Sequence, residues 1–156
     1  VLRPHPMTRI KYPDFLDSLY GEFKGFNNFK SEENVSGLDS FYDSDLMISD
    51  WSGVVYEFAL GTEKPVLFID VPMKVNNQDY RKFKFEPIDI ELRKRIGVVI
   101  SLDNVGRIDS IISKLLKDKD KFRESIIKAR KELVFNFGNS SSAGAKFIQD
   151  YCSKKS

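Results

Sequence analysis

Residues 45–70 read D-L-M-I-S-D-W-S-G-V-V-Y-E-F-A-L-G-T-E-K-P-V-L-F-I-D, and this stretch decides the fold. A short apolar run at residues 46–48 leads into an Asp-Trp-Ser-Gly turn, and a helical pattern over residues 54–60 follows. A proline then introduces a second apolar run at residues 66–69. Two strands joined by a helix in this order predict one unit of a parallel sheet.

The turn is the part of this unit that points to function. The helix is expected to begin near Ser52 and Gly53, where free backbone N–H groups and the positive end of the helix dipole meet the carboxyl end of a strand. Ligands of open α/β sheets bind at that edge, and phosphates favour such helix N-termini. Serine is also a common N-cap, so the turn alone leaves an anion site and an ordinary cap both open.

Composition limits the class of protein. The 156 residues suffice for one domain with its own core, and we predict a single domain over residues 1–156. The chain is 41% hydrophobic and 31% charged, which is typical of a soluble globular protein. A formal charge of +2 gives no indication of nucleic-acid binding. The one cysteine, Cys152, excludes an internal disulfide, and neither a membrane span nor a signal peptide is visible.

Further elements are predicted on both sides of the central unit. They are a strand at residues 1–3, a helix opening at Pro13, a turn of helix at residues 40–44, a strand at residues 97–101, a helix capped at Asp103 and Asn104, a helix at residues 119–135, and a last helix from residues 139–142 to about Tyr151. Residues 70–95 are predicted to be a long polar connection. Strands that alternate with helices predict an α/β fold with a doubly wound, mostly parallel sheet.

The glycine-rich dinucleotide fingerprint and the phosphate-binding loop of nucleotide triphosphatases are both absent, and no cofactor is predicted. His5 is the one histidine, and it is predicted to lie just past a strand end between two prolines that restrict its backbone. An imidazole there could bind a phosphate or move a proton, or it could be a loop histidine without a function. With no second histidine or cysteine beside it, we predict no metal site.

Other polar side chains follow the predicted strands. Asp50 could bind ribose or glycerol hydroxyls, or cap the helix. Glu57 lies one helical turn beyond Gly53 and on the same side, with surface solvation as its alternative. Lys74 and Asn76, on the long connection, offer an ammonium and an amide that could hold an anion, or they belong to a solvated loop.

Three motifs together resemble a known family. They are R-P-H-P at residues 3–6, S-D-W-S-G-V-V-Y-E-F-A at residues 49–59 and K-P-V-L-F at residues 64–68. Their order and spacing resemble the C-terminal half of the CDP-glycerol glycerophosphotransferase family, the teichoic-acid and capsule polymer enzymes, across most of the chain. The family pattern T-D-Y-S-S differs here, because serine, tryptophan and glycine replace its threonine, tyrosine and second serine, and Glu57 replaces an aspartate.

The resemblance implies a fold, a function and a set of site residues. The chain would be the donor-binding domain, Rossmann-like, of a two-domain GT-B transferase, and itself a fragment that binds donor but is catalytically inactive. His5 is implied to be catalytic, and the implied donor-binding residues are Arg3, Asp50, Ser52, Gly53, Glu57, Lys74 and Asn76.

The implied partners are a nucleotide-activated donor such as CDP-glycerol and a polymer or lipid-linked acceptor bound through the missing domain. The implied location is cytoplasmic, with the inner face of the cell membrane as an alternative for the full-length protein. Two other functions stay open: a nucleotide-sugar epimerase-like domain and a non-catalytic α/β interaction module.

Overall fold

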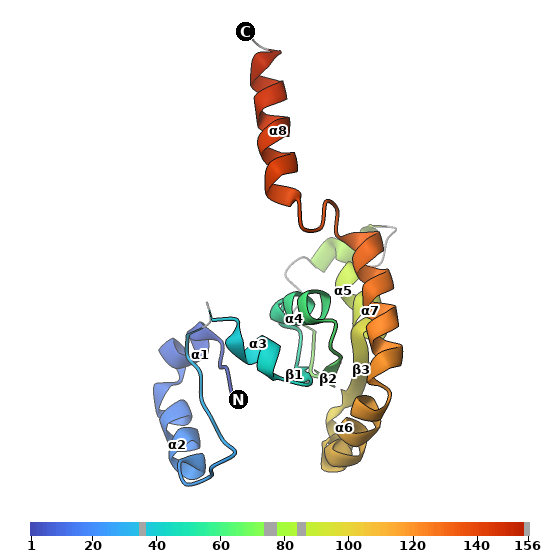
Figure 1. The fold of residues 1–156 in the computed structure, drawn as a ribbon. Helices are drawn as coiled ribbons and strands as arrows, with labels where there is room; N and C mark the ends of the chain where they lie inside the picture. The colour runs from blue at the N-terminus through green and yellow to red at the C-terminus, as the bar shows by residue number, and fades with distance from the viewer. Residues whose placement is uncertain (35–36, 74–77, 84–86, 155–156) are drawn as a thin grey trace. The chain divides into compact units, whose positions relative to one another are not determined.

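The chain divides into two units, Val1–Ser44 (unit 1) and Asp45–Ser156 (unit 2), where the sequence predicts one domain. The computed structural model describes residues 1–34, 37–73, 78–83 and 87–154. Figure 1 shows the helices and strands of each unit.

The described part of unit 1 contains the helices α1 (Pro6–Lys11), α2 (Pro13–Phe23) and α3 (Asp39–Asp43). A proline occupies the first turn of both α1 and α2, where its missing N–H costs no hydrogen bond. The predictions of a helix at Pro13 and of a short helical turn near residues 40–44 are confirmed. Helix α1 was not expected.

In place of the strand predicted at residues 1–3, the structure has an isolated β-bridge. Leu2 forms one parallel bridge with Ser31, in which its N–H donates to the Lys30 carbonyl (2.7 Å) and its carbonyl accepts from the Glu32 N–H (2.9 Å). The chain then enters α1 at Pro6. The position of His5 at the end of a sheet strand is therefore wrong, because His5 is the N-cap residue of α1.

Unit 2 is built around a parallel sheet. Within the described residues, β1 (Met47–Ser49), β2 (Val66–Asp70) and β3 (Gly97–Ser101) pair in the order β1-β2-β3, and α4 (Val54–Thr62) connects the first two. The register places Leu67 of β2 between Ile48 and Val98. The predicted α/β class and the parallel pairing are confirmed, and β2 is the central strand of the described sheet.

Gly97 marks the point where a helix runs directly into β3. A Cβ atom at this position would lie 1.8 Å from the Val66 carbonyl oxygen, far inside any permitted contact. The backbone there is extended, so space and not conformation requires glycine.

Residues 70–95 are not the irregular connection that the sequence predicted. A 3₁₀ turn covers Gln78–Lys82, and α5 (Ile88–Ile96) is a regular helix with Leu92, Arg93 and Ile96 buried. The helix predicted from Asp103 also begins later, because a 3₁₀ segment at Leu102–Arg107 precedes α6 (Ile108–Lys117). The last two predicted helices are present as α7 (Lys119–Leu133) and α8 (Ser140–Ser153).

Alternation along β2 shows how the sheet is covered. Leu67 packs with Ile100 and with Leu115 of α6, so α6 covers one face. The neighbouring Phe68 points to the other face, where the guanidinium of Arg93 from α5 lies over its ring at 4.8 Å. Helix α7 packs against α4 and α5 (Figure 1). None of the helices in the described ranges combines the length and the apolar character needed to cross a membrane.

Candidate functional site

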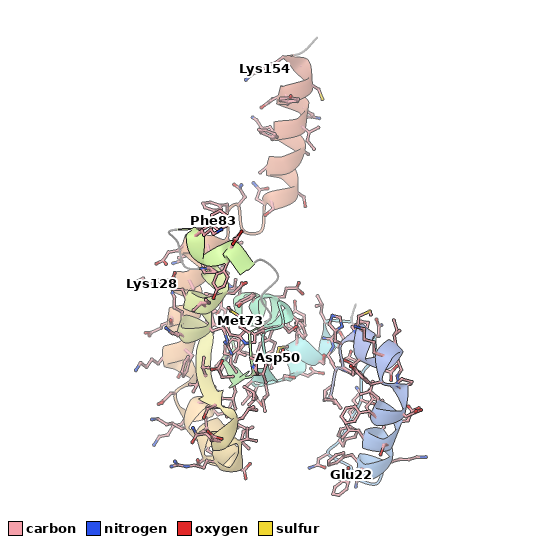
Figure 2. All side chains as sticks on the ribbon, turned by 180° about the vertical axis from the view of Figure 1, so that it is seen from behind. Glu22, Asp50, Met73, Phe83, Lys128 and Lys154 are labelled. Atoms are coloured by element: carbon pink, nitrogen blue, oxygen red, sulfur yellow. The ribbon has the colours of Figure 1, made fainter. Side chains whose placement is uncertain are left out.

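Two loops and one helix meet at the carboxyl edge of the sheet in unit 2. The first loop is the Asp-Trp-Ser-Gly turn after β1, and the second follows Asp70 at the end of β2. The indole Nε1–H of Trp51 donates to the Val71 carbonyl at 2.9 Å and ties the loops together. Figure 2 labels Asp50 and Met73, which follow these two strands. We call the group Asp50, Trp51, Ser52, Gly53, Asp70 and Arg93 the carboxyl-edge site.

The turn leaves the start of α4 open. Asp50 Oδ1 accepts from the Ser52 N–H at 3.1 Å, which closes an Asx turn. The N-cap residue is Gly53, and no side chain caps the helix, so the interpretation of Ser52 as a simple N-cap is wrong. The N–H groups of Gly53 and Val54 find no acceptor among the described residues. Free donors and a positive dipole end therefore face the edge of the sheet.

Arg93 lies beneath this turn. Its side chain comes from α5, where Cα–Cβ bonds tilt toward the helix N-terminus and so toward the carboxyl edge. The guanidinium carbon is 3.7 Å from the centroid of the Trp51 ring and 4.8 Å from that of the Phe68 ring. Arg93 is only 4% exposed. The stack holds the indole in place and, with it, the turn.

The charge of Arg93 is only partly compensated. Nη1 lies 3.3 Å from Asp70 Oδ1, and the Asp70 side chain is 51% exposed. Nε and Nη2 are buried and have no hydrogen-bond partner in the described part of the chain. A buried cation with one long ion pair keeps a positive potential, which the low dielectric of its surroundings strengthens. Together with the helix dipole, this potential favours an anion at the turn.

Tyr56 fixes α4 against the start of α5. Its hydroxyl donates to the Asp89 carbonyl at 3.2 Å. Burial, and after it the nearby Asp89 carboxylate, raises the pKa of Tyr56 to about 12, against the opposing charge of Arg93. Tyr56 is therefore a neutral donor at neutral pH, and its role is to hold the two helices whose ends frame the site.

The acidic side chains of the site are open to solvent. Asp50 and Glu57 are both exposed, and Asp50 keeps one carboxylate oxygen beyond the Asx turn. Such a carboxylate can accept hydrogen bonds from sugar or glycerol hydroxyls. Across the described ranges, no group of three or more His, Cys, Asp or Glu side chains is arranged to hold a metal ion.

The two candidate residues at the start of the chain belong to unit 1. The guanidinium of Arg3 donates to the carbonyls of Asn34 (3.2 Å) and Gly37 (3.0 Å) and to Ser40 Oγ (3.3 Å), and lies 4.9 Å from the centroid of the Phe41 ring. These contacts give Arg3 a structural role within unit 1, and its role in donor binding stays a prediction.

His5 is exposed, and its Nδ1 accepts from the Met7 N–H at 3.1 Å. In the neutral imidazole the proton is thus assigned to Nε2, which is directed away from this cap and able to donate. The catalytic role of His5 stays a prediction, as it rests on the resemblance.

The structure groups part of the predicted set. Asp50, Ser52, Gly53 and Glu57 lie together at the start of α4. Lys74 and Asn76 fall outside the described residues.

Sequence reasoning missed Arg93 because it placed the residue in a loop. The helical signals were present: Pro87 precedes the helix, acidic residues occupy its first turn and basic residues its last. Ile88, Leu92 and Ile96 also keep a spacing of four residues.

Comparison with protein-family models, with curated proteins and with solved structures gives no match to this chain.

Proposed function

We propose that unit 2 binds the phosphate groups of a nucleotide-activated donor at the carboxyl-edge site. The observation that carries this proposal is the partly compensated charge of Arg93 beneath the open N-terminus of α4. Helix N-termini and buried cations both favour phosphate, and here they act on the same turn. Neither feature depends on the resemblance of the motifs.

The resemblance suggests which donor and which reaction. The parallel sheet with helices on both faces is compatible with a Rossmann-like, doubly wound domain, the donor-binding half of a GT-B enzyme. On this proposal the donor is CDP-glycerol or a similar nucleotide-linked group, used for the synthesis of a cell-surface polymer. An acceptor hydroxyl attacks the activated phosphate or sugar carbon, and the nucleotide leaves.

Each residue of the site has a role in this proposal. The N–H groups of Gly53 and Val54 bind the diphosphate, and Arg93 is a positioning residue that holds Trp51 and supplies positive potential. Asp50 accepts from ribose or glycerol hydroxyls. For His5, a residue of unit 1, the resemblance implies a catalytic role.

An NMR titration of the 156-residue chain tests the proposal. CDP and CDP-glycerol should shift the amide signals of Ser52, Gly53 and Val54 and the Nε–H signal of Arg93 together. Arg93→Met should weaken binding by about tenfold, or 1.4 kcal/mol, because the positive potential beneath the turn is lost. Arg95→Met is the matched control on the same helix, since Arg95 is paired with Glu91 and Glu132 away from the turn.

The same titration distinguishes the alternatives. Shifts confined to α6, or equal losses in Arg93→Met and Arg95→Met, would show that the carboxyl-edge site is wrong. Binding of UDP-sugars without binding of CDP compounds would favour an epimerase-like domain. Absence of binding by CMP, CDP, CDP-glycerol and UDP-sugars would favour a non-catalytic module.

A further inference from the structure

A second hollow lies in unit 2, beside the last strand of the sheet. It has a volume of about 810 Å³ and is lined by residues from the end of α5, from β3 and from α6 and α7. Its floor is apolar, with Val98, Ile111, Leu115 and Phe122 among the lining residues. We call this hollow the β3 groove. A volume of this size is within the range of ligand-binding clefts.

The rim of the β3 groove is basic. Lys94, Arg107, Lys114 and Lys121 all line it and are exposed, and none of them has an ion-pair partner among the described residues. Asp118 is the acidic side chain on this lining. The charge of the groove therefore favours an acidic occupant.

The strand beside the groove has an unpaired side. In the described sheet β3 pairs with β2 alone, so the backbone groups on its other side have no partner strand. Its five residues, G-V-V-I-S, include neither a charge nor a proline, which are the usual means of blocking strand addition. Val99 is 36% exposed. An open, apolar strand edge is a template for one more strand.

We propose that the β3 groove binds an extended acidic segment of a partner protein, which adds to β3 as a fourth strand. Backbone hydrogen bonds to β3 provide affinity, and alternate side chains provide specificity. Apolar side chains of the segment contact the floor at Val98 and Phe122, and carboxylates contact the rim at Lys114 and Lys121. This surface is independent of the carboxyl-edge site and of the function proposed for it.

Fluorescence anisotropy with a defined probe tests this interaction. The probe is a nine-residue peptide in which Glu and Val alternate, carrying a neutral fluorophore, and the protein is the full 156-residue chain. Saturable binding that weakens as salt rises is expected. Absence of binding up to about 1 mM protein would overturn the proposal; a dissociation constant of that size corresponds to a binding free energy of about −4 kcal/mol.

Charge-reversal variants locate the binding. The double variant Lys114→Glu and Lys121→Glu should weaken binding of the probe by about tenfold or more, because it reverses the charge at two positions of the rim. Its matched control is Lys128→Glu with Lys131→Glu, which makes the same change in net charge at exposed positions of α7 that do not line the groove. Figure 2 labels Lys128. Circular dichroism confirms that both variants fold, and equal weakening by both would overturn the proposal.

Probe variants test the mode of binding. A peptide with Lys in place of Glu should not bind, and a peptide N-methylated at alternate residues should lose most affinity, because it cannot form a ladder. Undiminished binding of the N-methylated peptide would overturn strand addition.

Two measurements test other occupants. A concentration-dependent dimer that the probe does not dissociate would overturn the acidic partner in favour of a second copy of this chain. Binding to anionic vesicles, abolished by the rim variant and accompanied by no probe binding, would overturn it in favour of a lipid surface.

Discussion

In unit 1 the guanidinium of Arg3 donates to two carbonyls and a hydroxyl. In unit 2 the guanidinium of Arg93 is buried, and its Nε and Nη2 have no hydrogen-bond partner among the residues that the structure describes. Arg3 joins the start of the chain to the segment that leads into α3. Its hydrogen bonds stabilise a unit in which few apolar side chains are buried. Leu16 and Phe41 are its buried apolar side chains within the described range. Unit 2 has an apolar sheet interior and does not need Arg93 for the same purpose.

The difference separates stabilising charges from functional ones. A cation whose hydrogen bonds join separate segments of the chain contributes about 1–3 kcal/mol to folding through each of them. A buried cation with unused donors contributes little or costs stability, and such groups are concentrated at functional sites. The comparison therefore predicts that unit 1 depends on its arginine for folding, and that unit 2 depends on its apolar sheet.

The largest expected effect is loss of the sheet in Leu67→Asp. Leu67 is fully buried in the central strand and packs with Ile100 and Leu115. An unpaired carboxylate there should cost about 4 kcal/mol or more, which is most of the stability of a small domain. Hydrogen exchange should show loss of protection in β1, β2 and β3. Ile48→Asp, on an exposed position of β1, is the control, and a cooperative melt of Leu67→Asp near that of the parent would contradict the packing described for β2.

The second prediction tests the arginines directly. Arg3→Met should destabilise unit 1 by about 2–3 kcal/mol, because the carbonyls of Asn34 and Gly37 lose a charged donor. Arg93→Met should change the stability of unit 2 by less than about 1 kcal/mol, since methionine retains apolar contact with Trp51 and Phe68, and Asp70 is hydrated when unpaired.

Amide exchange of Glu32, whose N–H donates to Leu2, reports unit 1, and exchange in β2 reports unit 2. Equal destabilisation by the two substitutions would remove the distinction between the two arginines.

The sequence predicted unit 2 better than unit 1, for physical reasons. The strands of unit 2 are short apolar runs separated by turn residues. This pattern is local, so it can be recognised in the sequence. The helix start at Ser52 and Gly53 was also predicted, because these residues follow a predicted strand and precede a predicted helix. Unit 1 depends on contacts from Arg3 to residues more than thirty positions away, and no local pattern reports them.

The carboxyl-edge site was predicted only where it is local in sequence. Asp50, Ser52 and Gly53 are neighbours along the chain, but Arg93 is forty residues further on, and its stack with Trp51 forms only when the sheet does. A stricter reading of the spacing of Ile88, Leu92 and Ile96 would have indicated α5. It would not have indicated that Arg93 is buried, because arginine beside such a pattern is usually solvated.

A smaller effect is expected at His5. His5→Ala should destabilise unit 1 by about 1 kcal/mol, because the Met7 N–H loses its cap. His5→Asn should recover most of this loss, since asparagine is a good N-cap. The exchange rate of the Glu32 amide measures both. Similar losses in the two variants would show that the imidazole stabilises unit 1 through more than the cap.

The smallest expected effect concerns an ion pair in unit 2 that, like Arg3, has a structural role. Glu63 follows α4 and accepts from Arg130 Nη2 at 2.6 Å and from Arg123 Nε at 2.7 Å. Arg130 also donates to the Leu60 carbonyl at 2.9 Å, so these contacts fasten α7 to the end of α4. Hydrogen bonds from Arg130 and then Arg123 lower the pKa of Glu63 in the folded chain.

Glu63→Gln should therefore destabilise unit 2 by about 1 kcal/mol at pH 7, the upper end for partly exposed pairs. Because the folded pKa lies below the unfolded value, the stabilisation by Glu63 is present above the ordinary carboxyl pKa of about 4.3 and is lost as the pH falls through the folded value. The difference between parent and variant, from urea unfolding, should be constant between about pH 7 and 5 and should fall as the pH drops below the ordinary carboxyl pKa and through the folded value. Glu132→Gln is the matched control: Glu132 lies on α7, the helix that carries Arg123 and Arg130, and pairs with Arg95 of α5. Its side chain is 45% exposed, so its loss should cost only a few tenths of a kcal/mol. A difference for Glu63→Gln that persists unchanged at pH 3 would show that the glutamate acts through packing and not through its charge.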